Sequence, residues 1–258
     1  MSTRLAHLKS KLKKTAIMLK SHSLRKYVPA TRTFTFQNAM YMLKKYKVIY
    51  IKPDRGSYGK GVMKAQTWKR NGKTEYRLQY KRNIFRFDSA WKMYAAAKTI
   101  ARGRRYIVQR GIELLTFGSR PFDIRVMVQQ SPARKWETTG MLARIASPGQ
   151  IVTNYHSGGT PVEVDRVLSL YMTQQKVKTM KKNLAQLGLQ TAKHVHKHVP
   201  NLKEAGLDVA LDPKLRAWIL EVNTRPDAFV FRRLKHKAMF KKIYRYAQHY
   251  GKYKKRRK

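Results

Sequence analysis

The spacing of apolar residues predicts alternating helices and strands along the chain. Apolar residues that recur at intervals of three and four predict helices at residues 1–26, 35–45, 89–102, 165–187 and 231–250. Short runs rich in β-branched and aromatic residues predict strands at residues 48–51, 61–68, 74–80, 106–108, 123–130, 136–146, 207–211 and 217–222. In the helix that Ser89 caps, we expect Trp91, Tyr94 and Ala95 to face inward. In the first predicted helix, four leucines share one face: Leu5, Leu8, Leu12 and Leu19.

The glycine-rich segment at residues 56–61 is predicted to be a loop between two strands. Asn71-Gly72, further along, is a strong signal for a hairpin turn, so strands are expected on both sides of it. Glycines let backbone N–H groups approach phosphate oxygens, Ser57 adds a hydroxyl donor, and Lys52 stands at the end of the preceding strand. Walker and Rossmann loops open a helix, and this segment does not. Both nucleotide binding and an ordinary glycine-rich hairpin fit it.

Two acidic residues on neighbouring predicted strands indicate a metal site. Asp208 lies on one strand, and Glu221 and Asn223 lie on the next. The chain has only 13 Asp and Glu against 58 Lys and Arg, so carboxylates placed together on adjacent strands point to a function. Oxygen donors suit Mg²⁺, a hard cation that usually also binds substrate phosphates.

Other polar residues are candidates for anion contacts. Asp123 and Arg125 share one face of a strand because side chains alternate. Arg125 therefore either binds a phosphate through two hydrogen bonds or forms a structural ion pair. The polar loop at residues 154–160 contains glycines whose amides can bind a phosphate or acyl group. His156 in this loop is interpreted as an ordinary loop histidine, with a general base as the alternative.

The composition adds a strong positive charge. The net charge is +45, every acidic residue lies between Asp54 and Asp227, and the surface is expected to attract polyanions. No zinc-finger, helix-turn-helix or RNA-motif signature is present. The chain contains no Cys, which excludes disulfides and a Cys nucleophile. No apolar run reaches the length of a signal h-region or membrane span, so we expect a cytoplasmic protein.

Several segments together resemble the ATP-grasp superfamily: Ile51-Lys52-Pro53 with the glycine-rich loop, Val108-Gln109, Asp123-Ile124-Arg125, Asp208 and Glu221-Val222-Asn223. Longer motifs are similar to the YheC/YheD family, called endospore coat-associated: Lys52-Pro53-Asp54-Arg55-Gly56-Ser57, Pro121-Phe122-Asp123-Ile124-Arg125, Trp136-Glu137-Thr138-Thr139-Gly140, Ala143-Arg144-Ile145-Ala146 and Glu221-Val222-Asn223-Thr224-Arg225-Pro226. The resemblance covers roughly residues 27–232. It implies an α+β, ATP-grasp fold in which two subdomains hold a nucleotide between antiparallel sheets. The expected division is a basic helical extension at 1–26, a lid subdomain at about 47–105, a metal-binding subdomain at about 106–230, and a basic amphipathic helix and tail at 233–258.

The resemblance also implies a role for each matching residue. ATP would be bound by the end of the first strand, the glycine-rich lid and the hinge: Lys52, Gly56, Ser57, Gly59, Gly61, Val108, Gln109, Arg110 and Ile112. Two Mg²⁺ ions would be held by Asp208, Glu221 and Asn223, with Glu221 between them. The catalytic contacts to the reacting phosphate would come from Arg125, Arg144 and Asn154. The acceptor substrate would meet Arg225, Gly158 and Gly159.

The reaction that the resemblance implies is an ATP-dependent ligation. A substrate carboxylate takes the γ-phosphoryl group, and an amine or thiol then attacks the acyl phosphate. A non-catalytic protein of the same fold, structural or polyanion-binding and associated with the spore coat, is the alternative. A nucleic-acid-binding protein is a third hypothesis. The basic surface would also guide an anionic polymer to the site or bind nucleic acid non-specifically.

Overall fold

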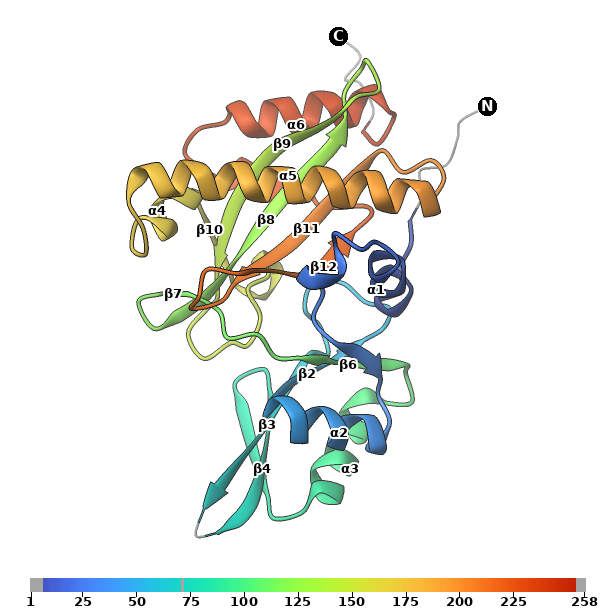
Figure 1. Ribbon diagram of the computed structural model, residues 1–258, viewed down its shortest axis with the longest axis vertical. Helices are drawn as coiled ribbons and strands as arrows, with labels where there is room; N and C mark the ends of the chain where they lie inside the picture. Colours follow the sequence, from blue (N-terminus) through green and yellow to red (C-terminus); the bar gives the residue numbers. More distant parts are fainter. Residues whose placement is uncertain (1–6, 71, 254–258) are drawn as a thin grey trace.

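The first of two antiparallel sheets is built from the N-terminal part of the chain. The computed structural model describes residues 7–70 and 72–253. The sheet has the order β1-β6-β2-β3-β4-β5 and lies in the lower half of Figure 1. Its strands are β1 (Thr31–Thr33), β2 (Val48–Pro53), β3 (Met63–Arg70), β4 (Lys73–Tyr80), β5 (Asn83–Phe87) and β6 (Tyr106–Arg110). Helix α2 (Phe36–Tyr46) buries Met42 beside β2 and β6, and helix α3 (Ala90–Ala101) buries Met93 in the same core beside β4 and β5.

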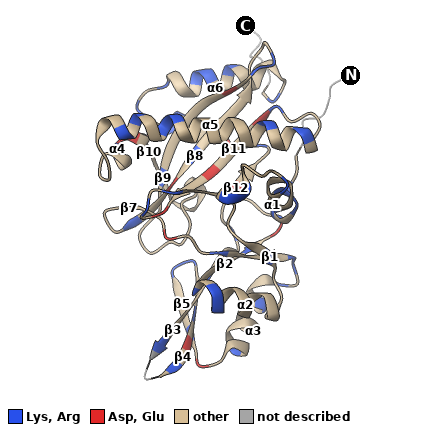
Figure 2. Ribbon diagram, in the orientation of Figure 1, with Lys and Arg blue, Asp and Glu red and all other residues tan. Residues whose placement is uncertain are grey.

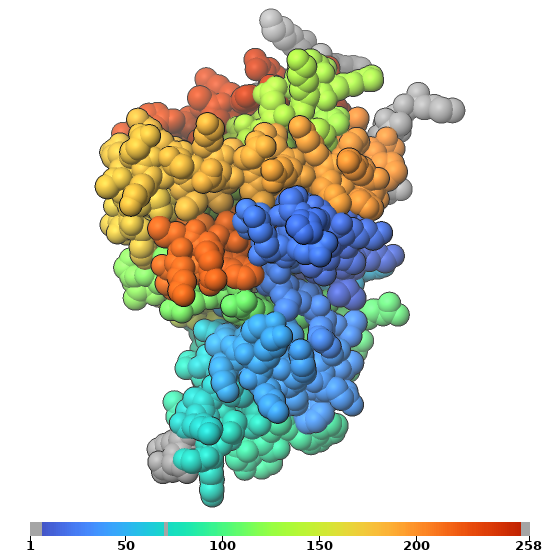
Figure 3. Space-filling view, in the orientation of Figure 1, coloured from blue at the N-terminus to red at the C-terminus, as the bar shows by residue number. Residues whose placement is uncertain are grey.

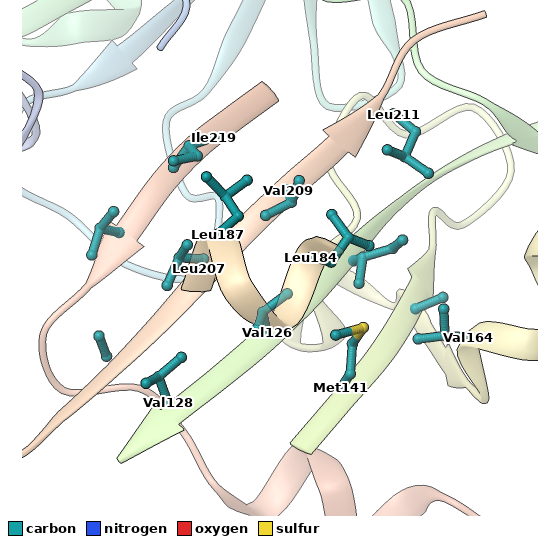
Figure 4. Close-up of a cluster of buried hydrophobic side chains, with 14 of the residues drawn as sticks. Val126, Val128, Met141, Val164, Leu184, Leu187, Leu207, Val209, Leu211 and Ile219 are labelled. Atoms are coloured by element: carbon teal, nitrogen blue, oxygen red, sulfur yellow. The ribbon is translucent and has the colours of Figure 1, made fainter. Parts of the chain in front are cut away.

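The second sheet holds the larger core. Its order is β10-β9-β8-β11-β12, with the short strand β7 paired to β8. The strands are β7 (Thr116–Phe117), β8 (Arg120–Gln130), β9 (Trp136–Ile145), β10 (Thr160–Val162), β11 (Glu204–Leu211) and β12 (Ala217–Asn223). Helix α5 (Gln174–His198) lies across one face, and Figure 4 shows its Leu184 and Leu187 beside Val126, Leu207 and Val209 of the sheet. Part of the opposite face is covered by η3 (Phe229–Arg233) and α6 (Ala238–His249).

The remaining helices are short: α1 (Lys11–Leu19), η1 (Arg25–Tyr27), η2 (Tyr155–Ser157) and α4 (Val164–Leu168). Helix α1 lies beside α5 and between the two sheets, where the dark blue residues appear in Figure 3. Lys and Arg recur along α5 and also occur on α1 and α2, whereas Asp and Glu are few (Figure 2). None of the helices in the described part of the chain combines the length and the apolar character needed to cross a membrane.

The predicted strands and hairpins are confirmed, and so is the α+β class. Residue 71 in the predicted turn lies outside the described residues, but its flanking strands β3 and β4 pair from Met63↔Tyr80 to Arg70↔Lys73. The first sheet runs from residue 31 to residue 110 and so extends on both sides of the predicted lid subdomain. That division into subdomains stays a prediction.

The predicted helix at 165–187 is wrong, because the chain forms two helices there. α4 ends at Leu168, and Thr173 is extended (φ −62°, ψ 159°) before α5 begins. Between them, the Tyr171 hydroxyl accepts a hydrogen bond from Thr116 N at 2.9 Å and donates one to Thr116 O at 2.6 Å. This long-range contact holds the segment at β7, which local periodicity does not reveal.

The predicted helix at 231–250 starts too early. The chain first makes η3, and Leu234 is extended (φ −66°, ψ 153°) so that its side chain is buried in the core beneath α6. Helix α6 then begins at Ala238. Burial of one leucine therefore outweighs the continuous helical pattern.

The inward faces of two helices were also predicted wrongly. In α3 the buried residues are Met93, Ala97 and Ala101, whereas Ala95 is exposed and Trp91 is 61% exposed, with its ring against Phe36. Within residues 7–26 the α-helix is α1, and Leu19 is 47% exposed while Met18 is buried. Leu5 lies outside the described residues.

Candidate functional site

Four strands of the second sheet carry a row of charged side chains on the face opposite α5. Asp123 on β8 lies across from Arg144 on β9, and Arg125 on β8 lies across from Asp208 on β11. Asp208 in turn lies across from Glu221 on β12. Because side chains alternate along a strand, the apolar residues between them point to α5 and the charged ones point the other way. The register thus brings together residues that are far apart in the sequence.

Buried ion pairs connect this row. Arg125 Nε donates to Asp208 Oδ1 at 2.5 Å, and an Arg144 guanidinium nitrogen lies 3.0 Å from Asp208 Oδ2. Arg144 also donates to both carboxylate oxygens of Asp123, with its Nε 2.8 Å from Oδ1. Burial by itself would raise the pKa of Asp208, but the guanidinium groups of Arg125 and Arg144 hold this pKa well below its ordinary value. Asp208 is therefore an anion at neutral pH, paired with two cations.

Glu221 is paired with the N-terminal helix. Its Oε1 lies 3.2 Å from Lys14 Nζ and 3.4 Å from Lys11 Nζ. Burial raises the pKa of Glu221, and the nearby ammonium groups of Lys14 and Lys11 more than offset this, so the pKa is lowered.

The first sheet supplies Lys52 from the opposite side. Lys52 Nζ donates to Gln109 Oε1 at 2.6 Å, and Gln109 Nε2 donates to Thr31 Oγ1 at 3.1 Å. Burial lowers the pKa of Lys52 to about 8, although the carboxylate of Glu221 acts in the other direction. An anionic ligand next to such a lysine would stabilise its charged form and raise its pKa again.

The glycine-rich loop folds onto the loop that follows β9. Tyr58 and Gly59 have positive φ (62° and 70°), and a Cβ at Gly59 would lie 3.2 Å from Asn154 Nδ2. Ser157 Oγ donates to Tyr58 O at 2.8 Å, and the Tyr58 and His156 rings are 4.1 Å apart. Glycine is thus required at 59 for both backbone conformation and close approach.

These parts surround one cleft of about 500 Å³ between the sheets. The size suits a small-molecule ligand. Most of the predicted site residues line it: Lys52, Gly56, Ser57, Gly59, Gln109, Arg110, Ile112, Arg125, Arg144, Asn154, Asp208, Glu221, Asn223 and Arg225. The structure therefore brings together the residues predicted for ATP, for metal and for catalysis.

Four predicted residues do not line the cleft. The Val108 side chain is fully buried in the core of the first sheet, and Gly61 packs against Tyr106. The N–H groups of Gly158 and Gly159 donate within their own loop, to Tyr155 O at 2.9 Å and Asn154 O at 3.0 Å. These two glycines shape the loop that carries Asn154.

Residues near both ends of the described chain line the cleft and were not predicted. They include His7, Lys11, Lys252 and Tyr253. Nothing distinguishes Lys11 or Lys252 among 58 basic residues, and only the fold reveals their place. Asp123 and Tyr58 also line the cleft. Asp123 forms an ion pair, one of the two alternatives that the sequence offers, although its partner is Arg144 and not Arg125.

The two ends of the described chain meet at residues 224–226, just after β12. Leu8 N donates to Thr224 Oγ1 at 3.0 Å. Lys252 Nζ donates to Pro226 O at 2.5 Å and also pairs with the buried Glu204 at 2.5 Å. The cleft wall beside Glu221 is therefore fixed from both directions.

The donor set on β11 and β12 fits a hard divalent cation. Asp208 and Glu221 are cross-strand neighbours, and Asn223 shares the face of Glu221. Carboxylate and amide oxygens are the ligands that Mg²⁺ accepts together with phosphate oxygens. No group of three or more His, Cys, Asp or Glu gathers within residues 7–70 and 72–253. An ion here would thus rely on two carboxylates, Asn223 and oxygens from a bound ligand.

The fold is that of an ATP-grasp protein, the class named by the family model that matches residues 6–253. The structure is similar to the crystal structure of D-cycloserine synthetase DcsG, with a TM-score of 0.56, over 93% of this chain and 70% of that one. The sequence identity is 10%, so this likeness shows the fold alone.

The sequence places the chain within one group of these proteins. The sequence model described as YheC/D like ATP-grasp matches residues 6–253, and the chain belongs to this family. It is 28% identical to the endospore coat-associated protein YheD of Bacillus subtilis (strain 168) over 190 residues, which is 72% of this chain and 41% of YheD. It is 23% identical to YheC of the same organism over 210 residues, 81% of this chain and 57% of YheC. The chain thus spans about half the length of these curated relatives.

Proposed function

We propose that this protein is an ATP-dependent ligase that joins a carboxylate to an amine or thiol through an acyl phosphate. The observation that carries the proposal is the cleft in which Lys52 of the first sheet opposes the Arg144–Asp208–Glu221 row of the second. A row of fixed charges beneath a glycine-rich loop can position a triphosphate and stabilise charge during phosphoryl transfer. The family and the synthetase of the same fold support this class of reaction.

Each side of the cleft would then take one part of the nucleotide. Lys52 and the glycine-rich loop would bind phosphates, and the backbone of residues 108–112 would meet the adenine. Arg125, Arg144 and Asn154 would contact the transferring phosphoryl group; Arg144 is linked to Asn154 by a 3.3 Å hydrogen bond.

The reaction would proceed in two steps, phosphoryl transfer to the carboxylate and then attack on the acyl phosphate. A carboxylate oxygen forms a bond to the γ-phosphorus while the bond to the ADP oxygen breaks. The amine or thiol then forms a bond to the acyl carbon, phosphate leaves, and the nucleophile gives up its proton. The contacts of Tyr58 with His156 and Ser157 would keep water from the acyl phosphate. Arg225, exposed at the cleft mouth, would meet the acceptor carboxylate.

Asp208, Glu221 and Asn223 would hold Mg²⁺, which when bound would offset the negative charge of the phosphates. The presence of two ions stays a prediction from the sequence. Cytoplasmic location and association with the spore belong to the same proposal, the latter because of the names of the relatives.

A thermal-shift titration with ATP tests the proposal. Wild type and Glu221→Ala are compared with and without Mg²⁺ at about 0.15 M salt, where surface charges are screened beyond about 8 Å. Glu113→Ala, a change at an exposed glutamate, is the matched control. We expect stabilisation that needs Mg²⁺, persists in Glu113→Ala and is lost in Glu221→Ala. Stabilisation that survives Glu221→Ala and disappears with added salt would overturn the proposal.

A non-catalytic, polyanion-binding role is the second candidate. It is favoured by the net charge of +45 and by α5, which has no acidic residue over its 25 residues. Such a protein would bind nucleic acid or another anionic polymer, with an affinity that falls steeply with salt. Binding of a polyphosphate that is unaffected by Glu221→Ala, combined with no ADP release in any acceptor screen, would favour this role.

A further inference from the structure

Helix α1 presents two lysine side chains to a single oxygen of Glu221. Lys14 Nζ and Lys11 Nζ both approach Oε1, at 3.2 and 3.4 Å. The two lysine side chains are only 5% and 11% exposed. Neither the family motifs nor the sequence pattern assigns these lysines to the site.

The backbone of this segment is fixed at the base of the glycine-rich loop. Asp54 Oδ1 accepts from Ser10 Oγ and from Leu12 N, both at 2.9 Å, and Lys11 N donates to Asp54 O at 2.8 Å. Lys11 Nζ also donates to Gly56 O at 3.0 Å. One lysine thus joins the loop to the strand that carries Glu221.

The other side of α1 is packed into the second-sheet core. Met18 is 2% exposed within this core, and the His194 ring of α5 hydrogen-bonds Ile17 O at 2.8 Å. The helix backbone cannot move away from Glu221 without breaking these contacts. Both lysines therefore stay within reach of the Glu221 carboxylate.

A carboxylate that bridges two metal ions uses one oxygen for each. Here Oε1 of Glu221 already faces two ammonium groups, whose combined charge equals that of one divalent ion. Each carboxylate oxygen has about two acceptor sites, so the two lysines occupy Oε1, whereas each oxygen of Asp208 faces one guanidinium group and keeps one site. Oε2 of Glu221 is then left for an ion shared with Asp208 and Asn223. We propose that this protein binds its nucleotide with one divalent ion and uses Lys11 and Lys14 in place of a second.

This inference rests on the proposed nucleotide site, and counting ions tests it without any turnover. The full chain is dialysed to equilibrium against Mn²⁺ and the β,γ-imido analogue of ATP, and bound manganese and bound nucleotide are both measured. The variants are Lys11→Met/Lys14→Met and the matched control Lys13→Met, a change at an exposed lysine on the same helix. Circular dichroism establishes that each variant is folded.

We expect a ratio of one manganese per nucleotide for wild type and Lys13→Met. In Lys11→Met/Lys14→Met the freed oxygen would admit another ion, and the ratio would rise to two. A ratio of two in wild type, or a ratio of one in the folded double variant, would overturn the inference. If the double variant does not fold, the wild-type ratio decides alone. Absence of any nucleotide binding by wild type would instead refute the proposed function, and the inference would fall with it.

Discussion

Replacing Asp208 by Asn should destabilise the protein strongly even without any ligand. Asp208 is 7% exposed and pairs with Arg125 and Arg144, of which Arg144 keeps a second partner in Asp123. Arg125 is 6% exposed, and Asp208 is the carboxylate that it pairs with. The substitution therefore leaves one buried guanidinium without its counter-charge, a change that typically costs about 3–5 kcal/mol. We take about 3 kcal/mol, because the neutral amide oxygen still accepts one hydrogen bond.

Urea denaturation at neutral pH measures this cost. With a slope of about 3 kcal/mol per molar urea for a chain of this size, the midpoint should fall by about 1 M. The matched control is Asp165→Asn, which breaks the exposed Asp165–Lys181 pair and should cost less than about 1 kcal/mol. Arg125→Met added to Asp208→Asn should recover part of the loss, since no unpaired charge then remains. Equal midpoints for the two single Asp variants would refute the reasoning.

Three further outcomes follow from other contacts. Because burial lowers the pKa of Lys52 to about 8, the charged form of Lys52 declines above that pH. ATP affinity should therefore fall from about pH 7 to about pH 9, and ATP binding should be accompanied by proton uptake. Calorimetry in buffers of different ionisation enthalpy would measure both effects, and an ATP affinity that does not change with pH would contradict the prediction. A Cβ at Gly159 would lie 2.1 Å from the Thr153 carbonyl oxygen, so Gly159→Ala should lower the free energy of unfolding by about 1–3 kcal/mol and lower the melting temperature. In the control Gly56→Ala the nearest new contact is 3.4 Å, and the melting temperature should stay unchanged. Lys252→Met leaves Glu204 buried without its counter-charge and should lower the free energy of unfolding, measured by urea denaturation, by about 3 kcal/mol. Adding Glu204→Gln should recover part of this loss. No recovery in the double variant would contradict the role of the ion pair.

The parts of the fold that the sequence predicts are those set by local pattern. Strand alternation and the Asn71-Gly72 signal predict the hairpins, and the same alternation places Asp123 and Arg125 on one face. The residues of the predicted metal site lie on two consecutive strands, so a single hairpin register brings Asp208 opposite Glu221. These features need no knowledge of distant contacts.

The parts that the sequence does not predict depend on contacts between distant segments. The break between α4 and α5 is held by Tyr171 at Thr116, and the late start of α6 follows burial of Leu234. Lys11 and Lys14 look like any other lysines until α1 is seen beside Glu221. Side-chain charge alone carries no information about which of many cations reaches a buried carboxylate.

The meeting of both ends of the described chain at residues 224–226 has a consequence for the order of folding. Leu8 is among the first described residues to be synthesised, and its hydrogen bond to Thr224 joins positions 216 residues apart. Lys252, whose ammonium group donates a hydrogen bond to Pro226 O, is synthesised only after Thr224. The cleft wall beside Glu221 therefore cannot close until nearly all of the described chain has been made. Because contacts between such distant positions form slowly, the sheets should assemble first and the site should be the last part of the molecule to become ordered.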